Sequence, residues 1–276
     1  MYSKLTELCF EIKTTTDGMK MESSLYFKTA LIVSVQIGII FVGCYFFIRR
    51  ARDAYNHGKP FFGIHFRGEE NSRGELDLIP IDPGPIISKS PLVEENNEAP
   101  TPQSSLMSKF MWVWFFSLFG MVFLASKSVV IGLSLMTLTS VTFAPLLGVI
   151  MLEMDENDGL RAILLTLFIT IAAALVGMYS GIDFSFMRTF LFYSLCALIL
   201  IGLVRIFVGM SSAMIRIKAI AGAILFSLFL VYDFNRLKNL NDIGVNDWST
   251  ALNMAISIYL DILNLLLEIL EAMGNS

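Results

Sequence analysis

Two carboxylates in the apolar C-terminal part of the chain, Asp233 and Asp261, are the residues whose type and spacing most directly suggest chemistry. Asp261 lies near the middle of an apolar stretch at 251–270, and Asp233 lies near the end of the preceding apolar stretch. A charged group at the centre of a membrane-spanning helix costs about 2.5–3.5 kcal/mol on insertion scales, so it usually faces a cavity or a partner. Two such acids on consecutive helices predict a site for protons or cations.

Polar neighbours accompany each acid at helical spacing. Arg236 follows Asp233 by one turn, so the two could pair on one helix face. Asn264 and Glu268 share a face with Asp261, and we expect this polar stripe to point into the bundle. Two simpler roles stay open: Asp233 as an interfacial acid balanced by Arg236, and Asp261 as a buried hydrogen-bond anchor between helices.

The depth of the two acids in the bundle depends on the turn between their helices. Both lie 14 positions from Asp247, about 21 Å along a helix. A turn centred nearer Gly244 would offset them by about 9 Å. Closing this gap would then need a kink or unwinding between Asn239 and Asn246.

The elements that must position these residues are membrane helices. Hydrophobic residues make up 55% of the chain and charged residues 16%, against about 25% charged in an ordinary soluble domain. Roughly 20 consecutive apolar residues are needed to span the hydrocarbon core. We count seven candidate spans: 27–48, 110–126, 128–152, 160–180, 184–209, 217–232 and 251–270. The sequence therefore predicts an all-α, polytopic, integral membrane protein with seven transmembrane helices.

The chain divides into four expected segments. These are a polar N-terminal segment at 1–26, a first transmembrane helix at 27–48, a hydrophilic Pro-rich loop at 49–109 and a six-helix remainder at 110–276. Proline and glutamate concentrate at 79–105, which is typical of a disordered linker. A partner-binding loop is the alternative. The small net charge of −4, without a basic stripe, gives no reason to expect nucleic-acid binding.

The last two helices resemble those of the Bax-inhibitor family, the transmembrane Bax inhibitor motif proteins. The resemblance rests on Gln36 and on residues 183–185, 222–227, 231–233 and 259–265, the last of these reading Tyr-Leu-Asp-Ile-Leu-Asn-Leu from Tyr259. It implies a seven-helix fold, a cytoplasmic N-terminus and a pH-sensitive calcium leak. The positive charges instead favour, weakly, an N-terminus on the outside.

The resemblance also assigns roles to residues. It implies that Asp233 and Asp261 share a proton as the pH sensor, with Arg236, Tyr259, Asn264 and Glu268 as supporting residues. Two carboxylates close together cannot both ionise cheaply, so the pair titrates as a unit. Deprotonated, the pair would offer hard oxygen ligands to calcium, which is the transported ion rather than a cofactor.

Two other functions were weighed against the leak. An intramembrane aspartyl protease also uses two aspartates on consecutive helices, but the residues before Asp261 are Ile-Tyr-Leu rather than Gly-x-Gly, so we do not expect an enzyme. The serious alternative is a non-conducting regulator that binds other membrane proteins, such as a quality-control protease or a cell-death factor. That function would survive neutralisation of Asp261.

Overall fold

The computed structural model describes residues 24–62, 64–70, 76–81, 104–125, 127–152, 154, 156–208 and 210–274. Residues 1–23 of the predicted N-terminal segment 1–26 lie outside the described residues. Residues 82–103 of the predicted linker at 79–105 also lie outside them. The elements, in chain order, are α2 (Leu25–Asn56), β1 (His65–Glu70), β2 (Leu76–Ile81), α3 (Ser104–Leu124), α4 (Val129–Leu152), α5 (Glu156–Tyr179), the 3-10 helix η1 (Phe184–Phe186), α6 (Met187–Val208), α7 (Ser212–Asp242) and α8 (Trp248–Gly274).

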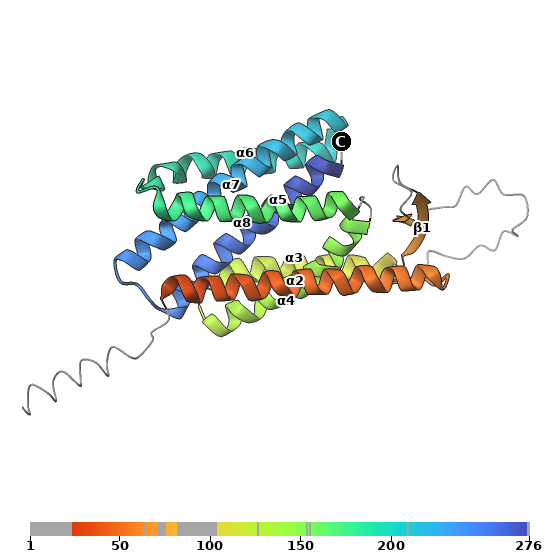
Figure 1. The fold of residues 1–276 in the computed structure, drawn as a ribbon, viewed down its shortest axis with the longest axis horizontal. Helices are drawn as coiled ribbons and strands as arrows, with labels where there is room; N and C mark the ends of the chain where they lie inside the picture. Colours follow the sequence, from red (N-terminus) through yellow and green to blue (C-terminus); the bar gives the residue numbers. More distant parts are fainter. Residues whose placement is uncertain are drawn as a thin grey trace, which may run out of the picture.

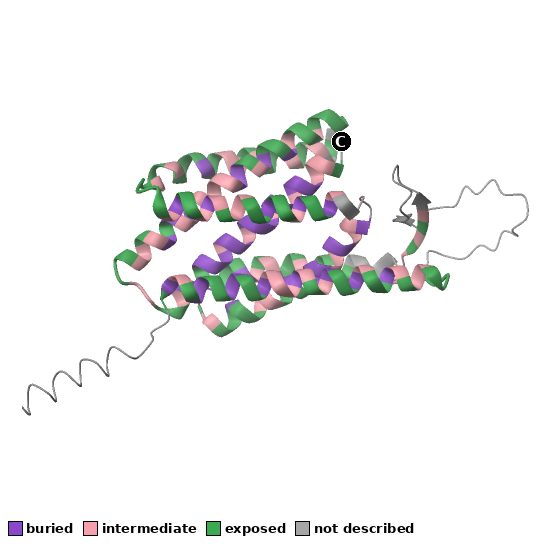
Figure 2. Ribbon diagram, in the orientation of Figure 1, coloured by how far each residue is buried: buried purple, intermediate pink, exposed green. Residues whose placement is uncertain are grey.

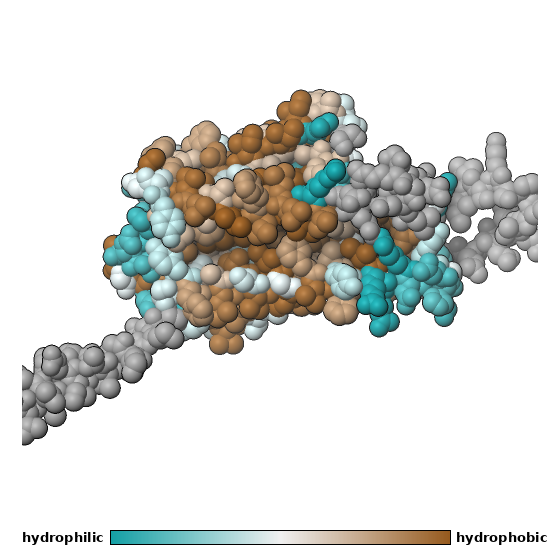
Figure 3. Space-filling view, viewed as in Figure 1, coloured by the Kyte–Doolittle hydropathy of each residue, from teal (hydrophilic) through white to brown (hydrophobic). Residues whose placement is uncertain are grey.

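The seven α-helices of the described residues form a bundle whose long axes run roughly alongside one another (Figure 1). Six of them are long and apolar enough to cross a membrane. The exception is α3, whose apolar part at Lys109–Leu124 is shorter, although the whole helix has 21 residues. The outer surface of the bundle is largely hydrophobic, with hydrophilic residues gathered towards its two ends (Figure 3). These features confirm the prediction of an all-α, polytopic membrane protein.

Helix α8 forms the centre of the bundle. In the most apolar 18-residue stretch of α8, 67% of the residues are buried inside the protein. In the corresponding stretch at the peripheral α6, only 6% of the residues are buried. Figure 2 shows buried residues along α8 behind the more exposed α5. Helices α2, α4, α5 and α7 all pack against it. The side chains of α8 therefore meet residues from most of the chain.

The hydrophilic loop contains a β-hairpin that the sequence analysis did not anticipate. Strands β1 and β2 pair antiparallel, with Phe66 opposite Pro80. Leu78 is only 2% exposed and packs with Phe47 and Ala51 of α2 and Leu152 of α4. Helix α2 continues past the predicted boundary at residue 48 to Asn56, and this extension carries the apolar patch that the hairpin covers. The predicted linker is therefore wrong at Ile79–Ile81, which lies in β2, and at Ser104–Ser105, which lies in α3.

Candidate functional site

The turn between α7 and α8 sets the register of the two helices that carry the acids. Helix α7 runs without interruption to Asp242, and Gly244 has a φ of 82°, a left-handed conformation that glycine adopts at little cost. Asp247 then starts α8, because its Oδ1 accepts a hydrogen bond from the Thr250 N–H at 2.8 Å, as expected of a helix N-cap. The chain therefore reverses within five residues.

The carboxyl groups of Asp233 and Asp261 contact each other between α7 and α8. They are 5% and 8% exposed, and their side chains are close enough to interact with each other, with Ser257 also close to Asp233. An ionised carboxylate only accepts hydrogen bonds, so a carboxyl–carboxyl hydrogen bond needs one protonated partner. Two acids placed in this way can hold one proton in common.

The two acids meet without the kink or unwinding that a turn near Gly244 was predicted to require. Asp233 lies nine residues before the end of α7 and Asp261 lies 13 residues after the start of α8, an offset of about 6 Å at 1.5 Å per residue. Helical side chains lean towards the N-terminus of their own helix. In this antiparallel pair Asp233 therefore leans away from the turn and Asp261 leans towards it. The lean of the two side chains brings the carboxyls together.

One carboxyl oxygen of the pair has no hydrogen-bond partner among the described residues. The Oδ2 atom of Asp261 is buried and has no hydrogen-bond partner in the part of the chain that the structure describes. A buried polar atom without a partner costs about 1–3 kcal/mol. A proton or a cation placed there would remove this cost.

Arg236 does not complete the pair in the expected way. Its residue is exposed, and although its charge is close enough to act on Asp233, the Asp233 side chain is buried beside Asp261 and Ser257. The expected i,i+3 pairing is therefore replaced by a contact with α8, because Asp233 is turned into the bundle. The influence of Arg236 on Asp233 is therefore that of a nearby positive charge.

Tyr259 serves a different part of the bundle. It is fully buried, and its hydroxyl lies 2.9 Å from the Ser140 Oγ of α4. Ser140 also donates to Gln36 Oε1 of α2 at 2.9 Å, and Gln36 donates to Thr137 Oγ1 at 3.0 Å. This network connects α2, α4 and α8 on the side of α8 away from α7. Tyr259 therefore positions α8 and does not contact the acids.

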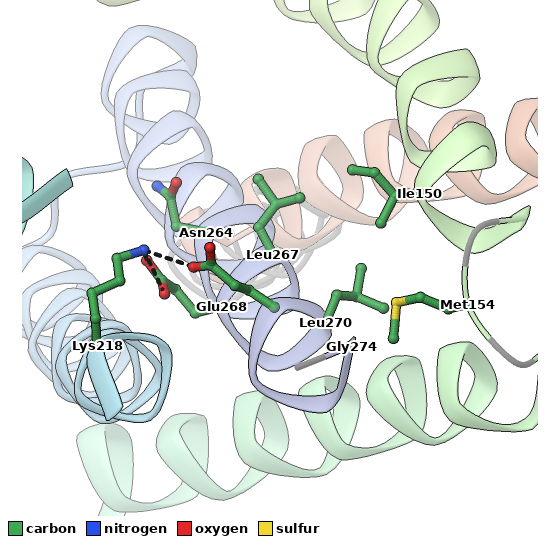
Figure 4. Close-up of a pocket in the computed structure, with 9 residues that line it drawn as sticks. Ile150, Met154, Lys218, Asn264, Leu267, Glu268, Leu270 and Gly274 are labelled. Atoms are coloured by element: carbon green, nitrogen blue, oxygen red, sulfur yellow. Dashed lines mark hydrogen bonds and ion pairs between the residues drawn. The ribbon is translucent and has the colours of Figure 1, made fainter. Parts of the chain in front are cut away.

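The rest of the polar stripe lines a cavity at the far end of α8. Asn264 and Glu268 lie in the wall of a cavity of about 510 Å³ (Figure 4). The Nζ atom of Lys218 on α7 lies 2.8 and 2.9 Å from the two carboxylate oxygens of Glu268 and 2.9 Å from Oε2 of Glu271. Asp261 lies one turn from Asn264, towards the middle of the bundle. The polar stripe therefore runs from the cavity wall to Asp261.

Several residues of this site were missed from the sequence. Lys218 and Ser257 show no local spacing to their partners, because they pair across helices. Lys28, at the start of the first predicted span, is 7% exposed and binds the α7–α8 turn. Asn235 is also buried, and it donates to the Gly177 carbonyl of α5 at 3.0 Å. The rarity of Lys and Asn beside apolar stretches was the available signal.

A family model described as "Inhibitor of apoptosis-promoting Bax1" matches residues 83–276, which include the cavity and both acids. The chain belongs to the Bax-inhibitor family. Among its relatives, an uncharacterised protein of Helicobacter pylori strain 26695 is 32% identical over 176 residues, covering 60% of this chain and 72% of that protein. Protein LIFEGUARD 4 of Arabidopsis thaliana is 31% identical over 114 residues, covering 40% and 44%. The Golgi anti-apoptotic protein of vaccinia virus strain Lister is 32% identical over 117 residues, covering 42% and 47%. The expected Bax-inhibitor resemblance is confirmed.

Proposed function

We propose that this member of the Bax-inhibitor family is a pH-sensitive calcium leak controlled by the Asp233–Asp261 pair. The observation that carries the proposal is the close approach of two buried carboxyls, Asp233 of α7 and Asp261 of α8. It is supported by the orphaned Oδ2 atom of Asp261, which leaves an oxygen available for a hard cation. Calcium is the transported ion in this proposal, and the pair is a transit point rather than a storage site.

The protonation state of the pair controls how α7 and α8 fit together. With one shared proton the two carboxyls attract, and their hydrogen bond latches the helices. After its loss two like charges face each other, and at about 4 Å with an effective dielectric constant of 20 they repel by about 4 kcal/mol. This exceeds the roughly 1 kcal/mol that a neutral hydrogen bond contributes. The proton therefore closes the pathway and its departure opens it.

Calcium flux into proteoliposomes tests the proposal, scanned from about pH 5 to about pH 8, the range in which paired carboxyls titrate. The wild-type flux should rise with pH. Asp233→Asn and Asp261→Asn remove the shared titration, so both should flatten this dependence. Glu268→Gln is the matched acid on the same helix face and should leave the pH at half-maximal flux unchanged. Equal flattening by all three variants would contradict the assignment of the pair.

The second candidate is a non-conducting regulator, favoured by the description of the family model and by the vaccinia relative named an anti-apoptotic protein. Such a protein would act by binding a membrane-protein partner, for which the segment between α2 and α3, residues 57–103, is available. Folded protein that gives no flux above empty liposomes at any pH would support it. Under this function Asp261→Asn would retain protection in a cell-death assay, whereas deletion of residues 82–100 would remove it.

A further inference from the structure

A second cavity, of about 250 Å³, lies between α2, α5, α7 and α8 and is mainly apolar. Its floor is formed by Ile258 and Ile262 of α8, which are only 2% and 9% exposed. Residues of α2 line one wall and residues of α5 line the other, and both of these helices also pack directly against α8. The cavity therefore separates α2 from α5, with α8 at its base.

The threonine hydroxyls in the cavity wall are already bound to main-chain carbonyls. The Oγ1 atom of Thr29 donates to the Ala251 carbonyl at 3.4 Å, and the Oγ1 atom of Thr170 donates to the Thr166 carbonyl at 2.8 Å. A buried water molecule needs about two to four polar partners, and cavities lined by aliphatic and aromatic side chains stay dry. The interior of this cavity therefore suits hydrocarbon better than water.

The cavity opens sideways on the outer surface of the bundle. Ala30 and Ser34 of α2 line it and are exposed, and their small side chains leave a notch one turn long in that helix. The adjacent residues Leu31 of α2 and Ile171 of α5 are 44% and 52% exposed. The face of the bundle that carries α2 and α5 is largely hydrophobic (Figures 1 and 3). The mouth of the cavity is thus continuous with the surface that this membrane protein presents to lipid.

We propose that an acyl chain of a bilayer phospholipid enters this cavity between α2 and α5 and packs on Ile258 and Ile262. An empty apolar cavity forfeits the dispersion contacts of the side chains around it. Lipid hydrocarbon is the medium at the mouth, and several methylene groups fit within the volume. The acyl chain therefore supplies the packing between α2 and α5 that the protein itself leaves open.

The lipid site borders the seam between α7 and α8 that holds the two acids. Leu237 of α7 lies one turn from Asp233, and Ile258 of α8 lies one turn from Asp261; both apolar residues line the cavity. An acyl chain at this place supports the α7–α8 pair from the side of α2 and α5 and keeps water from that edge of the seam. The lipid site does not depend on calcium conduction, so it stands or falls separately from the leak.

Photo-crosslinking from the lipid tests the proposal on the complete protein in proteoliposomes. The probe is a phosphatidylcholine with a diazirine in the distal half of one acyl chain, and its adducts are mapped by mass spectrometry. We expect adducts at Ile258 or Ile262, which lipid outside the bundle does not reach, and at Leu200 of α6, which is 61% exposed. Adducts at Leu200 with none at the floor would overturn the proposal, whether the cavity is then empty or is covered by a second copy of the chain or by residues 1–23.

Filling the cavity provides the second arm of the experiment. Ala30→Phe combined with Thr170→Phe places a ring in each wall, so the adducts at the floor should be lost while those at Leu200 remain. Ala197→Phe is the matched control, because it makes the same change at an exposed position of α6 and should leave the floor adducts in place. Floor adducts that persist in the filled protein would overturn the proposal. Either substitution alone repeats the test if the combined variant does not fold.

Discussion

The ammonium of Lys28, in the second turn of α2, donates a hydrogen bond of 2.7 Å to the main-chain carbonyl of Asn246, in the turn that joins α7 to α8. A second bond of 3.1 Å reaches the Asn246 side chain, and the ammonium lies 5.3 Å from the centre of the Trp248 ring. All of these partners are uncharged. A single buried lysine thus fastens the first described helix to the hairpin that carries both acids.

Removing this lysine should destabilise the protein. Lys28→Met keeps the aliphatic stem but leaves the Asn246 carbonyl without its donor, at a cost of about 1–3 kcal/mol. Thermal unfolding in detergent should show a lower Tm. Lys127→Met changes an exposed lysine at the same end of the bundle and should leave Tm unchanged; equal losses in both proteins would contradict the anchoring role.

The Tyr259 hydroxyl should contribute to stability and not to pH sensing. Tyr259→Phe breaks the bond to Ser140 and should lower the free energy of unfolding by about 1 kcal/mol. Because the hydroxyl contacts Ser140 rather than an acid, the pH at half-maximal flux should not move. Ser140→Ala should produce a non-additive loss when combined with Tyr259→Phe. Tyr193→Phe, at a 67% exposed position, is the control.

Gly222 should tolerate no side chain. Gly222→Ala would force a methyl group to 2.5 Å from Glu268, and overpacking of this kind costs about 1–3 kcal/mol. Gly38→Ala is the matched control, since a Cβ there has nothing within 4 Å and alanine favours the helix by about 0.5–1 kcal/mol. Opposite shifts in Tm are therefore expected. A loss at Gly38 as large as that at Gly222 would refute the close contact.

The N-cap of α8 should make stability depend on pH. Hydrogen bonds from the Thr250 backbone and side chain hold the pKa of Asp247 below its usual value. A lowered folded-state pKa stabilises the protein above the unfolded-state pKa, and this contribution disappears as the pH falls through the folded-state pKa. Asp247→Ala should therefore lower Tm at neutral pH, and the difference from wild type should shrink in acid.

Asp247→Asn keeps an oxygen that can form the N-cap hydrogen bond but removes the negative charge. The amide oxygen can still accept from the Thr250 N–H, so most of the stability at neutral pH should remain. Since asparagine does not titrate, the acid-dependent loss assigned to Asp247 should be absent. A Tm difference between Asp247→Ala and wild type that stayed constant from neutral to acid pH would rule out the linkage.

The length of the apolar stretches predicted the helices. The rarity of acids within such stretches pointed to the two aspartates. Asp233 and Asp261 stood out because each interrupts an apolar stretch. Their contact could not be derived from spacing, since it depends on the opposed lean of side chains in antiparallel helices. Lys218 and Lys28 find their partners across 50 and 218 positions of the chain, and no local pattern encodes such pairs.

The β-hairpin was missed for another reason. His65 and Arg67 are exposed on β1 while Phe66 between them is partly buried, an alternation too short to stand out from a hydrophilic loop. The decisive contact is that of Leu78 with the ends of α2 and α4. One of its partners, Ala51, lies in the part of α2 beyond the apolar stretch, and hydropathy alone does not reveal this extension.

The central position of α8 bears on how the protein is made. Ser140, Lys218 and Asp233 all precede α8 in the chain, yet each finds a polar partner on it. While the chain emerges in order, six of the described helices precede α8, and Lys218 and Asp233 lack their α8 partners until it is inserted. The insertion of α8 supplies the partners of Lys218 and Asp233 together, so the polar interior of the bundle is completed only by the last described helix.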